Sequence, residues 1–122
     1  MALTEFGKAV RKARIDVGYT LLTMAEELGT TPAFLSGMET GAKKIPAKWV
    51  DSIYGFFKSK DYEIKHLSEL AHVSNESIPV DGLSLQQKML VAGFAKSQFT
   101  PEELQRFAGL LNQLNGRKDN DE

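Results

Sequence analysis

The chain has 122 residues, of which 42% are hydrophobic and 25% are charged, and its formal net charge at pH 7 is −1. This length and composition support one compact domain with an appendage and exclude a disordered chain. Cysteine is absent, which excludes disulfides, thiolate metal sites and cysteine nucleophiles. The apolar runs fall far short of the ~20 residues that a membrane helix needs, and no signal peptide is expected, so we predict a cytoplasmic protein without a membrane partner.

The charge is distributed unevenly between the two halves of the chain. Residues 1–60 carry nine Lys or Arg against six Asp or Glu, a net charge of +3, whereas residues 61–122 carry six against ten, a net charge of −4. A phosphate-binding surface is therefore expected in the first half, and the acidic second half is unsuited to nucleic acid.

The N-terminal part of the chain predicts three helices. The first covers residues 4–17, and residues 21–40 then predict two short helices joined at a tight turn. Gly29 supplies the permissive backbone of this turn, and Thr30 or Thr31 can cap the helix that follows. Apolar residues at helical spacing within the segment are Met24, Ala25, Leu28, Phe34, Leu35 and Met38. This pattern is typical of a helix-turn-helix DNA reader.

Two more helices are predicted before a boundary. A basic loop at residues 42–46 precedes a helix over 47–57, and a further helix begins at Asp61 and reaches about residue 73. Residues 74–82 contain Asn, Pro and Asp-Gly, which predicts a linker, a turn or a short strand at Ile78–Val80.

Capping signals open two C-terminal helices. Ser84 precedes Gln87 by three residues, and Thr100 is followed at once by Pro101, so a helix is predicted to begin at each place. The second helix is predicted to end at Gly116. The resulting organisation is a DNA-binding domain at 1–73, a linker at 74–82, a C-terminal helical region at 83–116 and a disordered tail at 117–122.

An ordered set of residues in the first half identifies a family resemblance. In chain order, the set is Arg11, Arg14, Gly18, Thr20, Ala25, Gly29, Leu35, Ser36, Glu39, Thr40, Gly41 and Pro46. The segment from about Phe6 to Phe57 thereby resembles the Xre family, the phage-repressor (Cro/CI) type of helix-turn-helix domain. We therefore expect an all-α fold: a five-helix, repressor-like helix-turn-helix bundle followed by a C-terminal helical hairpin used for dimerisation.

The resemblance implies how double-stranded DNA would be read. Residues 31–38 would enter the major groove of the DNA. The base-reading positions of the family correspond here to Thr31, Pro32, Ala33, Ser36 and Gly37. None of these residues offers the bidentate pairing of Gln, Asn or Arg, so specificity would rest on hydroxyl groups, contacts with thymine methyls, waters and DNA shape.

Phosphate binding is expected from residues around the motif. Leu21 stands where many family members carry a Gln that grips a phosphate, so the role passes to other residues. The expected phosphate-binding residues are Thr20, Lys43, Lys44 and Lys48. Arg11 and Arg14 are open alternatives, because an arginine on the first helix of this family often pairs internally, here as Arg14 with Glu39.

The two C-terminal helices cannot bury their apolar faces alone, because a hairpin of ~30 residues has too small a core. We expect them to form a homodimer interface, and the alternative is that they fold back onto the N-terminal bundle as core. The expected interface residues are Val91, Phe94, Leu104, Phe107, Leu111 and Leu114. The predicted function is a sequence-specific, homodimeric (auto)repressor that binds an inverted-repeat operator and, when bound, associates with the nucleoid.

A different class of function remains as the alternative. In it, the chain is an antitoxin or a protein-interaction adaptor whose C-terminal helices bind a toxin or another protein. An enzyme is not predicted, because no Gly-rich phosphate loop or Ser-His-Asp arrangement can be assembled. His66 and His72 lie six residues apart on different helical faces, so neither a metal site nor a cofactor is expected.

Overall fold

The computed structural model describes residues 2–120, with side chains up to residue 116. Over this range the chain forms seven helices and no strand, which confirms the predicted all-α class. A short strand at Ile78–Val80 is therefore wrong, and these residues have no regular structure. None of the helices within 2–120 has the length and apolar character that crossing a bilayer requires. The chain divides into two compact units, residues 1–79 and residues 80–122, and the division falls within the expected linker.

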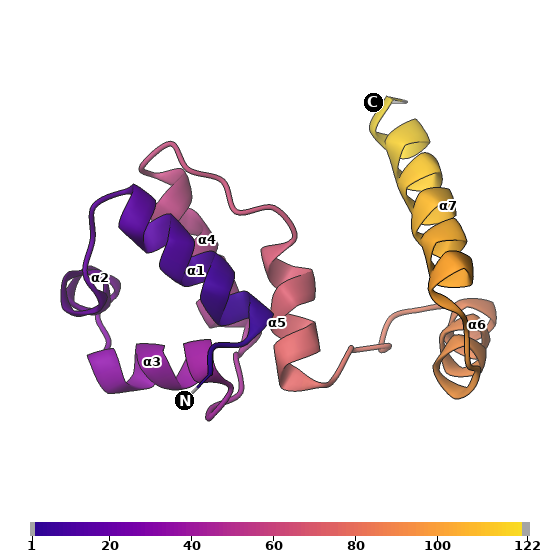
Figure 1. The fold of residues 1–122 in the computed structure, drawn as a ribbon, viewed down its shortest axis with the longest axis horizontal. Helices are drawn as coiled ribbons and strands as arrows, with labels where there is room; N and C mark the ends of the chain where they lie inside the picture. The colour runs from indigo at the N-terminus through magenta and orange to yellow at the C-terminus, as the bar shows by residue number, and fades with distance from the viewer. Residues whose placement is uncertain (1, 121–122) are drawn as a thin grey trace. The chain divides into compact units, whose positions relative to one another are not determined.

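The first unit contains five helices, drawn from indigo to pink in Figure 1. They are α1 (Glu5–Asp16), α2 (Leu21–Leu28), α3 (Pro32–Thr40), α4 (Ala47–Lys58) and α5 (Leu67–Asn75). Helix α1 packs against α3 and α5, α2 packs against α3 and α4, and α4 packs against α5. Helix α5 starts six residues later than predicted from Asp61, and it extends into the expected linker. The loop before it contains Asp61 and His66 with φ of 60° and 61°, a left-handed backbone that ends helical geometry.

Threonine caps set the starts of the first three helices. The Oγ1 atoms of Thr4, Thr20 and Thr31 accept hydrogen bonds from backbone N–H groups three residues later in the chain. Gly29 and Gly41 end α2 and α3 with φ of 76° and 83°, a conformation that glycine adopts without a Cβ clash. The predicted turn at Gly29 is therefore present, and Thr31 is the cap of the helix after it.

The core of the first unit is formed by side chains from all five helices and from two loop residues. The buried apolar residues are Phe6, Val10, Ala13, Met24, Ala25, Leu35, Met38, Ile45, Val50, Ile53, Phe56, Phe57, Ile64, Leu67 and Ala71. Ala25 of α2 is fully buried, and α2 packs against α3. These side chains form one hydrophobic core within the unit.

The second unit contains α6 (Leu85–Lys96) and α7 (Pro101–Asn120). Ser84 and Thr100 cap these helices as predicted, since each hydroxyl accepts a bond from the backbone N–H three residues on. The predicted end at Gly116 is wrong, because α7 continues to Asn120. A helix tolerates an interior glycine at a cost of about 1 kcal/mol relative to alanine. The expected tail thus begins as helix, and residues 121–122 lie outside the described residues.

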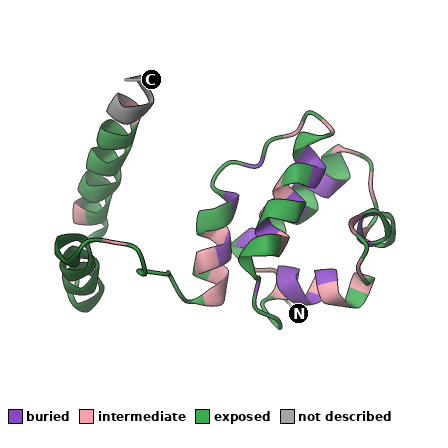
Figure 2. Ribbon diagram, turned by 180° about the vertical axis from the view of Figure 1, so that it is seen from behind, coloured by how far each residue is buried: buried purple, intermediate pink, exposed green. Residues whose placement is uncertain are grey.

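The two helices of the second unit do not form the expected side-by-side hairpin. In Figure 1, α6 is seen end-on while α7 is seen lengthwise, so their axes cross. Their contact is an aromatic cluster of Phe94, Phe99 and Phe107, with ring centroids 4.9–5.3 Å apart. Phe99 lies in the segment that connects the helices, and its ring contacts Phe94 of α6 and Phe107 of α7. Figure 2 shows this unit almost wholly in the colour of exposed residues, and α6 has no buried residue.

Candidate nucleic-acid interface

The expected base-reading residues differ in exposure along α3. Thr31 and Ala33 are exposed, and Pro32 and Ser36 are half-buried. Leu35, Met38 and Glu39 face the interior, so α3 has one buried side and one side open to solvent. The side chains on the open side are small and weakly polar, and they offer the hydroxyls of Thr31 and Ser36 and methyl groups as contacts.

Gly37 is a correction to the expected set. The residue is buried, because the aliphatic stem of Lys43 lies over it: a Cβ on Gly37 would be 2.9 Å from Lys43 Cδ. The backbone N–H of Lys43 also donates to the carbonyl oxygen of Gly37, at 3.0 Å. With the lysine stem in this position, Gly37 is not open for close approach by DNA.

Lys43 and Lys44 have different surroundings although they are adjacent in sequence. The Lys43 ammonium is exposed and lies 5.7 Å from the ring centroid of Phe34 on α3. The Lys44 ammonium donates instead to the backbone carbonyl of Asn75, at the end of α5. The side chain of Asn75 also holds the backbone of Ile45, donating to its carbonyl at 3.0 Å and accepting from its N–H at 2.8 Å. The basic loop is therefore fastened to α5, and Lys43 is its more available cation.

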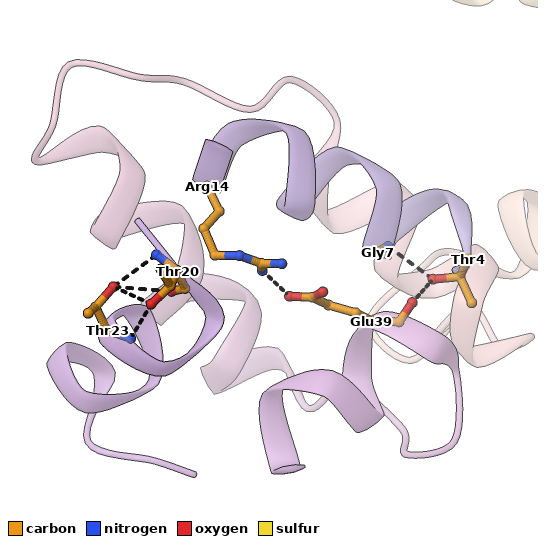
Figure 3. A network of polar contacts seen from close by, with 6 residues as sticks. All are labelled: Thr4, Gly7, Arg14, Thr20, Thr23 and Glu39. Atoms are coloured by element: carbon orange, nitrogen blue, oxygen red, sulfur yellow. Dashed lines mark hydrogen bonds and ion pairs between the residues drawn. The ribbon is translucent and has the colours of Figure 1, made fainter. Parts of the chain in front are cut away.

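Thr20 and Lys48 lie at helix starts. The hydroxyl of Thr20 accepts from the Thr23 N–H at 3.1 Å, and the Thr23 hydroxyl accepts from the Thr20 N–H at 2.9 Å (Figure 3). Thr20 is thus exposed but engaged in a capping box, which fixes the first turn of α2. Lys48 is exposed in the first turn of α4.

Unpaired positive charge in the first unit is concentrated after α3. Among the side chains described up to residue 116, the basic residues of this unit that pair with a carboxylate are Lys8, Lys12, Arg14, Lys58 and Lys60. The basic residues without such a partner in the same range are Arg11, Lys43, Lys44, Lys48 and Lys65. Three of these five belong to residues 43–48, which makes this segment the strongest candidate for phosphate contact.

A buried ion pair joins α1 to the end of α3. Arg14 Nη1 donates to Glu39 Oε2 at 2.6 Å, and both side chains are more than nine-tenths buried (Figure 3). Burial raises the pKa of Glu39, because the loss of hydration outweighs the hydrogen bond and the attraction from Arg14. Of the two alternatives for Arg14, the internal pair is the one that forms, so this guanidinium is not a free phosphate ligand.

Two hydrogen bonds from Thr4 also join the start of α1 to the end of α3. The Thr4 N–H and the Thr4 hydroxyl both donate to the Glu39 carbonyl oxygen, each at 3.0 Å. Gly7 is buried beside this carbonyl, and a Cβ on it would be only 2.0 Å from the oxygen. The orientation of α3 therefore depends on a residue without a side chain, which the sequence pattern of a helix did not reveal.

The exposed apolar surface of the second unit is broader than the expected interface residues. Val91, Phe94, Leu104, Phe107, Leu111 and Leu114 are 37–59% exposed, and Phe94 and Phe107 also pack on each other. Sequence reasoning missed four further apolar side chains that are at least half exposed: Leu85, Met89, Leu90 and Leu110. Leu85, Met89 and Leu90 lie on α6, where they occupy more than one helical face and so give no clear periodic pattern, and Leu110 lies on α7.

Comparison of the chain with protein-family models, with curated proteins and with solved structures gave no match. Within the described residues, no group of three or more His, Asp or Glu side chains is placed to hold a metal ion.

Proposed function

We propose that this chain is a sequence-specific DNA-binding regulator of the Xre type, which represses transcription as a homodimer on an inverted-repeat operator. The observation that carries the proposal is the combination at α3. A short helix with an open, small-residue side follows a glycine turn, and the unpaired cations of residues 43–48 come directly after it. A major groove flanked by phosphates has the matching shape and charge.

The contacts of such a complex follow from the exposed groups. Thr31 and Ser36 supply hydroxyls to base edges, and Ala33 supplies a methyl group suited to thymine. Lys43 and Lys48 supply the main phosphate contacts, and Thr20 orients the start of α2 toward the backbone of the DNA. Lys44 contributes less to phosphate binding, because its ammonium donates to the Asn75 carbonyl oxygen. Repression would follow from steric exclusion of polymerase.

A second copy of the chain is the proposed partner of α6 and α7. Helix α6 carries Lys88 and Lys96 and no acid, whereas the first turn of α7 carries Glu102 and Glu103. In a two-fold symmetric dimer, α6 of each copy can therefore lie against α7 of the other, with complementary charge and both apolar surfaces covered. Such a dimer would present two copies of α3 to two half-sites.

The exposed surface of α6 also favours a second candidate function. An antitoxin or adaptor would use the same apolar side chains to bind a different protein, and DNA binding by the first unit is compatible with that role. The two candidates differ in what the isolated chain does, because a self-complementary surface dimerises without a partner and a surface for another protein does not.

A gel shift on the DNA immediately upstream of the gene tests DNA binding. We expect a shift that survives excess nonspecific competitor at physiological salt. Lys43→Ala should weaken binding to all sequences and lower the slope of log K against log salt by about 0.9. Lys44→Ala is the matched control and should have a smaller effect, whereas Ser36→Ala should change site preference more than total affinity. A shift that competitor abolishes would contradict the proposal.

Truncation tests the homodimer. We expect the full chain to have about twice the 13.5 kDa mass of one copy in light scattering. Residues 1–82, which contain the complete first core, should remain folded but run as a monomer that binds DNA poorly. A dimer of residues 1–82 would show that the interface lies elsewhere, and a monomeric full chain would favour the adaptor candidate.

A further inference from the structure

A groove of about 720 Å³ runs beside the open side of α3. Three helices and the basic loop contribute to its lining. The residues that matter to its chemistry are Arg11 from α1, Leu21 from α2, Ala33, Ser36 and Thr40 from α3, and Lys43 from the loop. The groove is therefore part of the surface that would face DNA, and α1 contributes to that surface.

The charge of the groove is positive. Arg14 and Glu39 also line it, but they neutralise each other in the buried pair. Arg11 and Lys43 remain, and neither has a carboxylate partner among the side chains described up to residue 116. Arg11 is near enough to Glu39 to lower the pKa of that carboxyl by its charge, yet Glu39 is already bonded to Arg14. The Arg11 guanidinium is exposed and its donors are free for an external acceptor.

We infer that Arg11 binds a backbone phosphate of double-stranded DNA, together with Lys43, when α3 lies in the major groove. The inference rests on the proposed function and adds α1 to the phosphate-binding elements. The donors of a guanidinium group match the two free oxygens of a phosphate, and Arg11 would not have to break an ion pair within the protein to bind one. Since the side chain of Leu21 has no donor for a phosphate, Arg11 supplies the cation on the α1 and α2 side of α3.

The salt dependence of DNA binding tests this inference, with Lys12 as the matched control. Lys12 lies next to Arg11 on α1 and carries the same charge, but its ammonium pairs with Asp16 at 3.5 Å and does not line the groove. Binding of the full chain would be measured by fluorescence anisotropy on the operator and on a random duplex, from about 50 to about 200 mM salt.

Arg11→Ala should lower the slope of log K against log salt by about 0.9 on both duplexes, because one phosphate contact is lost. The advantage of wild type over Arg11→Ala should then shrink about 3.5-fold between the two salt concentrations. Arg11→Lys should recover most of the slope, Lys12→Ala should keep the wild-type slope, and Arg11→Ala with Lys43→Ala should lower it by about 1.8. Far-UV circular dichroism of each variant checks that the helices are intact, and Arg11→Gln replaces Arg11→Ala if the latter does not fold.

Two results would overturn the inference and can be told apart. If wild type binds DNA and Arg11→Ala has the same slope as Lys12→Ala, Arg11 is not a phosphate ligand although the proposed function stands. If wild type does not bind either duplex, the proposed function and the inference both fail.

Discussion

Replacing Gly7 with alanine is the sharpest test of how α3 is held. A Cβ at this position would be 2.0 Å from the Glu39 carbonyl oxygen, 2.8 Å from its carbonyl carbon and 3.0 Å from its Cα. All three atoms are backbone, so no side chain can move aside. Helices α1 and α3 must separate by more than 1 Å before the Cβ and the Glu39 carbonyl oxygen reach an ordinary contact distance of about 3.4 Å.

The expected loss of stability can be estimated from the contacts at this junction. Separation breaks the two hydrogen bonds from Thr4 to Glu39, each worth about 1 kcal/mol net. Overpacking costs about 1–3 kcal/mol, and the better helix propensity of alanine returns about 1 kcal/mol. The free energy of unfolding should therefore fall by about 2–4 kcal/mol, a large share of the ~4–12 kcal/mol expected for a unit of this size.

Gly55→Ala is the matched control, because it makes the same substitution within a helix of the same unit. Nothing lies within 4 Å of a Cβ on Gly55, which is exposed in α4, so the variant should be more stable by about 0.5–1 kcal/mol. Urea unfolding can be followed by the fluorescence of Trp49, the only tryptophan, whose ring centroid is 5.4 Å from that of Phe34 on α3. The reasoning is refuted if Gly7→Ala is as stable as wild type or if both variants change stability in the same direction.

Three further predictions concern other parts of the chain. Burial raises the pKa of Glu39, so the native state binds the proton of this carboxyl more tightly than the unfolded chain does. The free energy of unfolding should therefore fall as pH rises through the native pKa of Glu39. In urea titrations, Glu39→Gln should remove this pH dependence. Asn75→Ala should cost about 1–3 kcal/mol in the same assay, because it leaves the Ile45 backbone groups without partners, and an unchanged midpoint would mean that the loop is held otherwise. Leu111→Asp should shift the proposed homodimer toward monomer in light scattering without changing the Trp49 unfolding transition, whereas Gln105→Asp on the same helix should leave the proposed dimer intact.

Features set by neighbours in sequence could be predicted without the structure. The Thr31 cap and the Gly29 turn each depend on groups within about four residues, so the sequence alone was enough to place α2 and α3. Within residues 21–40, the apolar residues at helical spacing likewise identified the core residues Met24, Ala25, Leu35 and Met38. Where a local signal failed, as at Gly116, the reason was that one glycine is too weak to stop a helix.

Features of the candidate site that depend on distant residues were decided by the tertiary structure. The stem of Lys43 covers Gly37, and the Asn75 carbonyl holds Lys44, although the second pair is 31 residues apart in the chain. The close approach of Gly7 to Glu39 and the groove that joins Arg11 to Lys43 also arise only when α1 packs on α3. By itself, the amino-acid sequence determined which segments are helical, because capping and periodicity are local. Only packing decided which cations of the candidate interface remain free, because Arg14 pairs with Glu39 of α3 and Lys44 bonds to Asn75 of α5.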